Sequence, residues 1–190
     1  MRYSALYILL FSLLFFFAGS SALAGTRKEV QFTDITITTS TSHLLLFAVL
    51  KNNKHLDLEQ ALHSGIPMQF KFFIDLYRTR DNWPDEELVS IEFVHTLKYD
   101  TLKENYQLER TEQKNRKFTF KSLEEAMKVM NDINGLKVIE LSRLQPDASY
   151  ELRMKAELYK KTLPMNLHYL IPFISLWDLE TDWFTIEFTY

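Results

Sequence analysis

The stretch that decides the fold is Leu144-Gln145-Pro146-Asp147-Ala148-Ser149-Tyr150-Glu151-Leu152-Arg153-Met154-Lys155-Ala156. Its first half carries the proline, aspartate and serine that are typical of a tight turn. From Tyr150 onward apolar and polar residues alternate, which is the period of a strand with one buried face. The stretch therefore predicts a turn that leads directly into a strand, with Leu152, Met154 and Ala156 pointing into the core.

The spacing of this stretch resembles fibronectin type III and related immunoglobulin-like domains at the turn between two strands. In those domains a tyrosine near the start of a strand hydrogen-bonds back to the backbone a few residues upstream. The resemblance implies that Leu144, Pro146 and Tyr150 form such a tyrosine corner. It covers only this stretch, so it implies an architecture and no activity.

Strand character extends over most of the rest of the chain. Alternating residues over 30–37, 68–78 and 88–95 indicate strands with one buried face. The run Leu44–Leu50 is apolar throughout, as in a central strand that is buried on both faces. Residues 183–188 are expected to form the last strand, paired with the strand after the corner. The sequence therefore predicts a mostly β fold, an immunoglobulin-like antiparallel β-sandwich.

One α-helix is expected as an insertion in this sandwich, over about 123–133. Ser122 and Glu125 form a capping box, in which each residue satisfies an orphan backbone N–H of the other. Apolar residues then recur at helical spacing until Asn134-Gly135 ends the run. A shorter connecting helix fits the helix formers of Asp57–Gly65.

A long exposed hairpin is expected between residues 99 and 120. Its tip, Arg110–Lys117, is polar and charged, as in a solvated turn between two strands. The region around Asn115 is therefore one candidate surface for binding a partner.

The N-terminus has the pattern of a secretory signal peptide over residues 1–24. An apolar run from Ala5 to Ala18 follows a short basic start, and Ala22-Leu23-Ala24 has small residues where signal peptidase requires them. We expect cleavage after Ala24, a single domain over 25–190, and a periplasmic or secreted protein. The alternative is an uncleaved segment that anchors the chain to the inner membrane, although the apolar run is short for a bilayer span.

Composition excludes several classes of function. The chain has no cysteine, which removes disulfides, thiol catalysis and a lipid-attachment cysteine. A formal net charge of −3 gives no electrostatic footprint for nucleic acid or for an anionic membrane. We therefore expect stability to come from a hydrophobic core, and no nucleic-acid partner.

No catalytic residue, cofactor or metal site is expected. The histidines lack the helical spacing of a metal site, and no nucleophile elbow or glycine-rich phosphate loop occurs. Side chains with carboxylate or amide oxygens are concentrated at Asp81–Glu87 and Asp178–Asp182. Two interpretations apply to each group: a Ca²⁺ site, or a solvated acidic turn, which is the more frequent of the two. The five histidines are His43, His55, His63, His95 and His168.

The segment Leu163–Trp177 carries no formally charged residue across its 15 positions and contains two prolines. Two explanations stay open. It folds back over one end of the sandwich as core, or it is a surface for a partner protein or the membrane interface. The residues of the candidate surface are Tyr169, Leu170, Ile171, Phe173, Ile174 and Trp177.

Four motifs resemble a family of bacterial exported proteins known as a domain of unknown function. They are Thr36–Ser40, Asn82–Glu86, Leu97–Asp100 and Ser175–Trp183. The family implies no catalytic residue, and its association with envelope-sensing kinases implies a sensory or envelope role. The sequence thus predicts a non-enzymatic envelope module that binds an envelope protein or the membrane interface. The alternative is a periplasmic sensor domain that binds a small ligand or ion and partners a membrane signalling protein; an enzyme is a third possibility without a recognisable motif.

Overall fold

The computed structural model describes residues 30–51, 56–158 and 180–190. The signal-peptide prediction and the candidate surface within Leu163–Trp177 lie outside the described residues. Two short 3₁₀ turns, η1 (Thr111–Gln113) and η2 (Leu141–Arg143), accompany the main elements. Those elements are β1 (Gln31–Thr39), β2 (His43–Lys51), α2 (Leu56–His63), β3 (Met68–Arg78), β4 (Glu86–Asp100), β5 (Asn105–Arg110), β6 (Arg116–Phe120), α3 (Leu123–Met130), β7 (Asp132–Glu140), β8 (Ser149–Leu158) and β9 (Phe184–Thr189).

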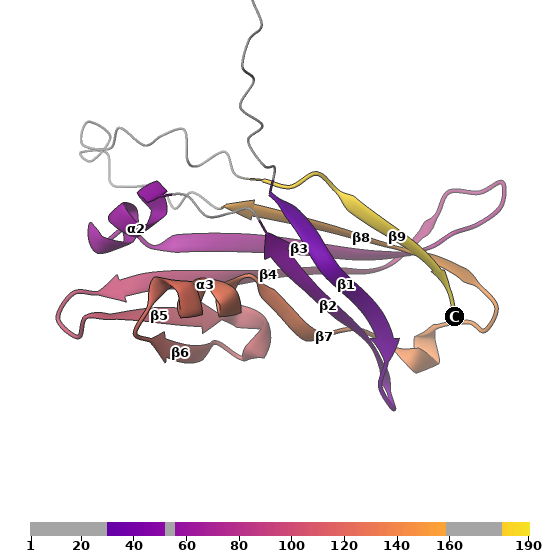
Figure 1. The fold of residues 1–190 in the computed structure, drawn as a ribbon. Coiled ribbons are helices and arrows are strands. Elements are labelled where there is room, and N and C mark those ends of the chain that lie inside the picture. The colour runs from indigo at the N-terminus through magenta and orange to yellow at the C-terminus, as the bar shows by residue number, and fades with distance from the viewer. Residues whose placement is uncertain (1–29, 52–55, 159–179) are drawn as a thin grey trace, which may run out of the picture.

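The strands form two antiparallel sheets (Figure 1). One sheet has the order β1-β2-β7, and the other has the order β6-β5-β4-β3-β8-β9. In the three-stranded sheet, β1, β2 and β7 correspond to strands A, B and E of an immunoglobulin-like sandwich. In the six-stranded sheet, β9, β8, β3 and β4 correspond to strands G, F, C and C′. The predicted mostly β sandwich with an inserted helix is therefore confirmed, and β5 and β6 widen its larger sheet.

The core lies between the facing sheets and is built by strand alternation. On β3 the inner residues Phe70, Phe72, Ile74 and Leu76 are fully buried, while their neighbours are half-buried. Phe72 is 6.4 Å, between ring centroids, from Phe32 of β1 in the opposite sheet. Burial of one residue in two along each strand thus supplies the apolar contact that holds the two sheets together.

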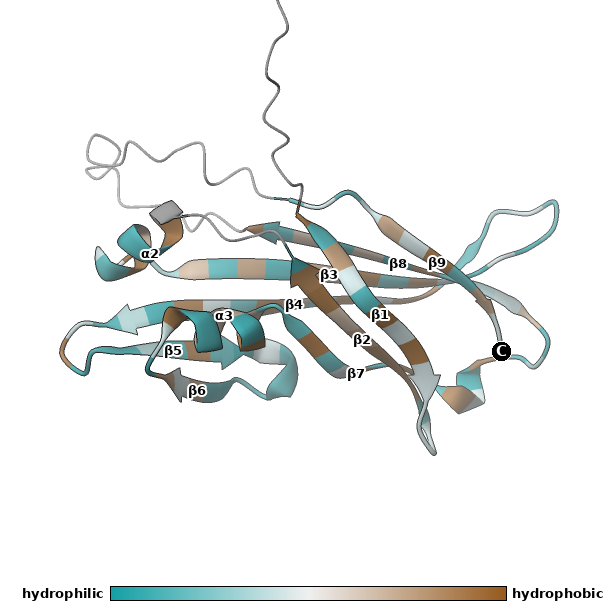
Figure 2. Cartoon of the chain, viewed as in Figure 1, coloured by the Kyte–Doolittle hydropathy of each residue, from teal (hydrophilic) through white to brown (hydrophobic). Residues whose placement is uncertain are grey.

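The apolar strand predicted at Leu44–Leu50 is β2, the middle strand of the three-stranded sheet. Figure 2 shows it coloured as hydrophobic along most of its length. Only alternate residues, starting with Leu44, are fully buried, and the residues between them are half-buried. The prediction of a central strand is correct, but its outer face is less covered than its inner face.

The inserted helix is shorter than predicted. The backbone N–H of Glu125 donates to Ser122 Oγ at 3.2 Å, so Ser122 caps the helix as expected, but α3 ends at Met130. Gly135 lies inside β7 as an extra residue opposite β2, with a φ of +69°. An added Cβ would lie 3.6 Å from the ring of Phe47. Pairing with β2 therefore overrides the helical pattern beyond Met130, and the glycine serves a bulge and not a helix end.

Helix α3 covers the part of the large sheet that the small sheet leaves free. It packs on β4, β5 and β6, and Figure 1 shows it in front of these strands. The buried face of the helix carries Ala126, Met127 and Met130. The insertion thus compensates for the extra width of the six-stranded sheet.

The turn before β8 has the geometry of a tyrosine corner. The backbone N–H of Gln145 donates to the Tyr150 hydroxyl at 2.6 Å, and the Tyr150 side chain is fully buried. Its ring stacks on Phe188 of β9, with centroids 5.6 Å apart. Leu144 is also buried, so the corner fixes the path by which the chain crosses from the small sheet to the large one.

The hairpin tip at Arg110–Lys117 differs from the solvated turn that its composition predicted. Lys114 and Asn115 do form an exposed turn, each with a φ of +58°. Arg110, however, is 3% exposed, and the Glu112 side chain is 10% exposed. The turn η1 folds Glu112 back between β4 and β5, so two of the charged residues are internal.

Candidate functional site

Two segments outside the described residues join the sandwich at the same end. Val30, which follows residues 1–29, and Glu180, which follows residues 159–179, line one pocket. The segment 159–179 also begins at this end of the sandwich. It follows Leu158, the last residue of β8, and the neighbouring Glu157 pairs with Glu180, where the segment ends. Before cleavage, both apolar stretches of the sequence, Ala5–Ala18 and Leu163–Trp177, are therefore tethered to one end of the domain, and after the expected cleavage behind Ala24 only Leu163–Trp177 remains there by its connection to Glu180.

The chain is fixed firmly where it returns to the domain. Thr181 is 4% exposed, its N–H donates to Ala156 O at 2.9 Å, and its Oγ1 accepts from Ala156 N at 3.0 Å. Beside it, Lys155 Nζ lies 3.1 Å from carboxylate oxygens of Glu180 and Glu157. The hydrogen bonds that Lys155 donates to Glu180 and then to Glu157 raise the pKa of Lys155 and keep it charged. The residues after Thr181 therefore leave from a rigid point.

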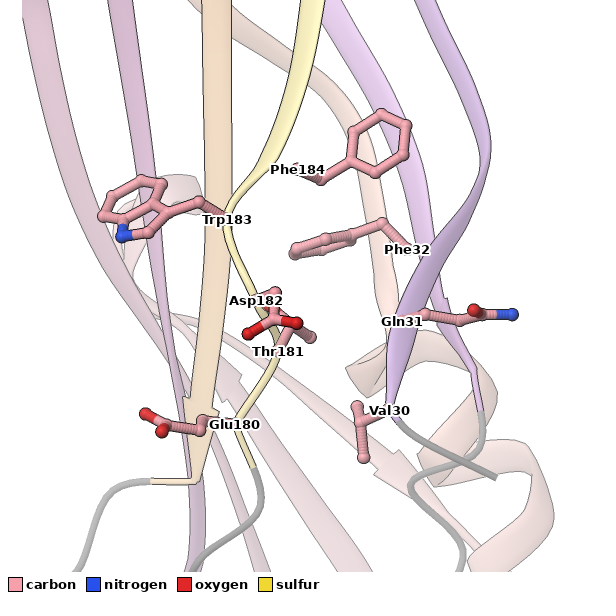
Figure 3. A pocket seen from close by; sticks show the side chains of 8 residues that line it. All are labelled: Val30, Gln31, Phe32, Glu180, Thr181, Asp182, Trp183 and Phe184. Carbon is pink, nitrogen blue, oxygen red and sulfur yellow. The ribbon is translucent and has the colours of Figure 1, made fainter. Parts of the chain in front are cut away.

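Two aromatic side chains follow this point and lie on opposite sides of the sheet (Figure 3). Trp183 points to the outer face, where its ring centroid is 6.4 Å from that of Phe73. Phe184 points toward Phe32 on the inner side. Trp183 is 48% exposed and Phe184 is 40% exposed, so this end of the sandwich presents two large apolar side chains to solvent.

A pocket of about 320 Å³ opens between the start of β1 and the residues that lead into β9. Its walls are both apolar and polar, with the phenyl rings on one side and carboxylates on the other (Figure 3). Glu180 is neutralised by Lys155, and the Thr181 hydroxyl is used in the backbone contact described above. The lining residues are Val30, Gln31, Phe32, Glu180, Thr181, Asp182, Trp183 and Phe184.

The residues predicted as possible oxygen ligands fall in the turn before β4 and before β9, and Asp178 lies outside the described residues. In the acidic turn, Glu86 pairs with Arg78 and Arg80, and the hydrogen bond from Arg78 lowers the pKa of that carboxyl. Asp182 is exposed in the pocket wall. Within residues 30–51, 56–158 and 180–190, no three His, Asp or Glu side chains are placed to bind a metal ion.

Sequence reasoning missed Trp183 and Phe184 as surface residues, because both were assigned to the last strand. Adjacent residues of a strand point to opposite faces, so two neighbouring large aromatics cannot both lie in the core. That rule was the available signal. It indicates that at least one of the pair is exposed, and the structure exposes both.

The described helices are too short for a membrane span. Helices α2 and α3 each have 8 residues, and no helix in the described ranges is long and apolar enough to cross a bilayer.

Fold and site together define an immunoglobulin-like sandwich that has an exposed aromatic pair at the end where two apolar segments join. The chain belongs to the family described as Domain of unknown function (DUF4390), whose model matches residues 27–187. No match is found among curated proteins or among solved structures. The predicted membership of an uncharacterised family is thus confirmed.

Proposed function

We propose that this protein is a non-enzymatic module of the bacterial cell envelope that contacts the membrane interface with one end of its sandwich. The observation that carries the proposal is the position of Trp183 and Phe184. They are exposed at the end to which both apolar segments of the chain are tethered.

The sequence of the two segments supports a membrane as the contacted surface. Residues 1–24 have the pattern of an export signal, with an anchor as the alternative. Leu163–Trp177 has no charged residue and carries Tyr169 and Trp177, the residue types that are enriched at headgroup depth. Trp183 adds a further aromatic side chain close to the point where the second segment rejoins the domain. Interfacial binding uses apolar and aromatic side chains of this kind.

The opposite end of the sandwich provides a matched control. Trp83 lies in the turn between β3 and β4 and is 75% exposed. That turn lies beyond Arg78, which pairs with Tyr150 at the start of β8, whereas the tethered end lies beyond Leu158 at the end of β8. Trp83 is therefore more exposed than Trp183 but lies at the opposite end from the points where the two segments join the domain.

The chain with Trp183→Ser and Phe184→Ser is expected to bind vesicles of phosphatidylethanolamine and phosphatidylglycerol at least about tenfold more weakly than the native chain. Two half-exposed aromatic side chains together contribute about 1.5–3 kcal/mol when buried, and 1.4 kcal/mol is a factor of ten. The measurement is flotation of the exported chain with vesicles in a density gradient. The Trp83→Ser chain is the control and should float like the native chain.

Equal flotation of all three chains would contradict the proposed contact. No flotation of the native chain, together with crosslinking in cells from position 183 to one envelope protein, would replace the membrane with a protein partner.

The pocket favours a second candidate function, a periplasmic domain that senses a small ligand for a membrane signalling protein. Its apolar and carboxylate walls suit a molecule with an apolar body and a hydrogen-bond-donating or cationic head. Native mass spectrometry of the protein purified from the envelope discriminates the two functions. A retained small molecule that is lost on Phe32→Ser substitution would favour the sensor, and a ligand-free protein that floats with vesicles would favour the membrane module.

A further inference from the structure

Three successive carbonyl groups, those of residues 130–132, lie where α3 passes into β7. They accept hydrogen bonds from His95 Nδ1 of β4 at 2.6 Å, from Leu50 N of β2 at 2.9 Å and from Arg110 Nη2 of β5 at 2.8 Å. Strand β2 belongs to the three-stranded sheet, whereas β4 and β5 belong to the six-stranded sheet. This junction therefore joins the two sheets at the inserted helix.

The ring of His95 is fully buried in this junction between two hydrogen-bond acceptors. Nδ1 lies 2.6 Å from the carbonyl oxygen of Met130, and Nε2 lies 3.1 Å from Glu112 Oε1. A carbonyl oxygen only accepts, and so does an ionised carboxylate. A neutral imidazole carries one N–H, so with an ionised Glu112 one ring nitrogen would direct its lone pair at an oxygen lone pair. One further proton removes this conflict.

We infer that His95 and Glu112 form a buried proton-binding site, which holds one proton more than a neutral histidine and an ionised glutamate carry. When the proton is bound, both ring contacts are hydrogen bonds and the junction between the sheets is complete. When the proton leaves, one contact becomes repulsive.

The proton belongs on His95 because Glu112 is held as a carboxylate. Arg110 Nε donates to the same oxygen, Oε1, at 2.7 Å. Burial raises the pKa of Glu112, but the hydrogen bonds and charges of His95 and Arg110 outweigh it and leave the pKa below its usual value. The stability that this carboxylate contributes is therefore present above the unfolded pKa, about 4.3, and is lost as pH falls through the lower folded value.

No other charged or titratable side chain has a described contact with the His95 ring. β3 contributes Phe72, β4 contributes Phe93, and α3 contributes only a carbonyl, so the facing charges are Glu112 from η1 and Arg110 from β5. Glu112 Oε2 is buried and has no hydrogen-bond partner. Since one carboxylate faces two cations, loss of the His95 proton leaves the Arg110–Glu112 pair intact and disrupts only the ring contacts.

The other histidines of the described chain do not need an extra proton. His43 Nδ1 lies 2.8 Å from the hydroxyl of Ser42, and His63 Nε2 lies 2.9 Å from the hydroxyl of Tyr106. A hydroxyl both donates and accepts, so a neutral ring is satisfied in each case. These two residues are internal references for His95.

The protonation of His95 is measurable by two-bond ¹H–¹⁵N correlation spectra of the ¹⁵N-histidine-labelled full chain at about pH 7.5, above the ordinary histidine pKa near 6.5. Both ring nitrogens of His95 should resonate in the N–H range, while His43 and His63 each show one nitrogen without a proton. Loss of signals in a His95→Gln chain assigns them. A His95 nitrogen that resonates without a proton at this pH would overturn the inference.

The Glu112→Gln chain tests the consequence for stability. Both His95 Nε2 and the Arg110 Nε–H face Oε1 in the native chain, so the amide must turn until its oxygen accepts from Arg110 and its NH₂ donates to Nε2. A neutral His95 is then satisfied and the extra proton is no longer required. The urea midpoint of the native chain should fall as the pH rises and the proton is lost, and that fall should be absent in Glu112→Gln. His63→Gln is the matched control and should keep the native fall. Equal falls in the native and Glu112→Gln chains would contradict the site, and the spectra of the native chain decide the matter if Glu112→Gln does not fold.

Discussion

Replacing Phe72 with alanine is expected to lower the free energy of unfolding by about 3–5 kcal/mol. Phe72 is fully buried at the centre of the six-stranded sheet. Its ring centroid lies 5.0 Å from that of Phe93, 4.8 Å from that of His95 and 6.4 Å from that of Phe32 in the other sheet. Truncation therefore leaves a cavity between the sheets that neighbouring strands cannot close without moving.

Urea unfolding followed by near-ultraviolet circular dichroism measures this loss. Phe73→Ala is the matched control, because Phe73 is the next residue on β3 but points to the outer face and is half-buried. Its truncation should cost less than about 1.5 kcal/mol. Similar losses for the two substitutions would mean that the sheets do not pack through Phe72, and would contradict the sandwich arrangement.

Replacing Arg110 with methionine is the second substitution with a large expected effect, about 3–5 kcal/mol of lost stability. Arg110 is 3% exposed and donates both to Glu112 and to the carbonyl of Asp132 in β7. Methionine keeps most of the apolar stem but removes the charge, so Glu112 loses its permanent cation and the Asp132 carbonyl loses its donor. A buried charge without its partner is the costly outcome.

Arg116→Met is the control for this experiment, because Arg116 pairs with Arg110 across the hairpin but is exposed on β6. Its guanidinium lies 4.9 Å from the ring of Phe118, a contact that contributes at most about 1 kcal/mol on a surface. The double variant Arg110→Met/Glu112→Gln should recover part of the loss, because the carboxylate that has lost its arginine is gone. Strictly additive losses would show that the two side chains do not interact in the fold.

The fold was predictable because its strands carry local signals that agree with their tertiary positions. The turn before Tyr150, the alternation on β3 and β8 and the apolar run of β2 each specify a strand with a defined buried face. Strands whose local sequence pattern agrees with their burial in the fold can be predicted from the sequence. The helix end at Met130 was not readable, because the pattern through Ile133 suits a helix and a strand equally and the pairing of Ile133 with Ala48 decides between them.

The candidate site was predictable only in part. The apolar character of Leu163–Trp177 is a local property of the sequence, whereas its attachment beside Val30 depends on the sandwich bringing the start of β1 next to the lead into β9. The burial of Glu112 beside His95 gave no local signal either. Glu112 lies in a charged stretch that is typical of a solvated turn, and only the folding of η1 against β4 and its pairs with His95 and Arg110 take it out of water.

The central claim, that the tethered end contacts a membrane, is tested most directly by fluorescence quenching with brominated lipids. The chain has three tryptophans, so one form retains only Trp183 and a matched form retains only Trp83, with phenylalanine at the other two positions. In vesicles that contain brominated phosphatidylcholine, the emission of Trp183 should be quenched and that of Trp83 should be unchanged, because bromine quenches only fluorophores at lipid depth. Equal quenching at both positions, or none at Trp183, would contradict the account.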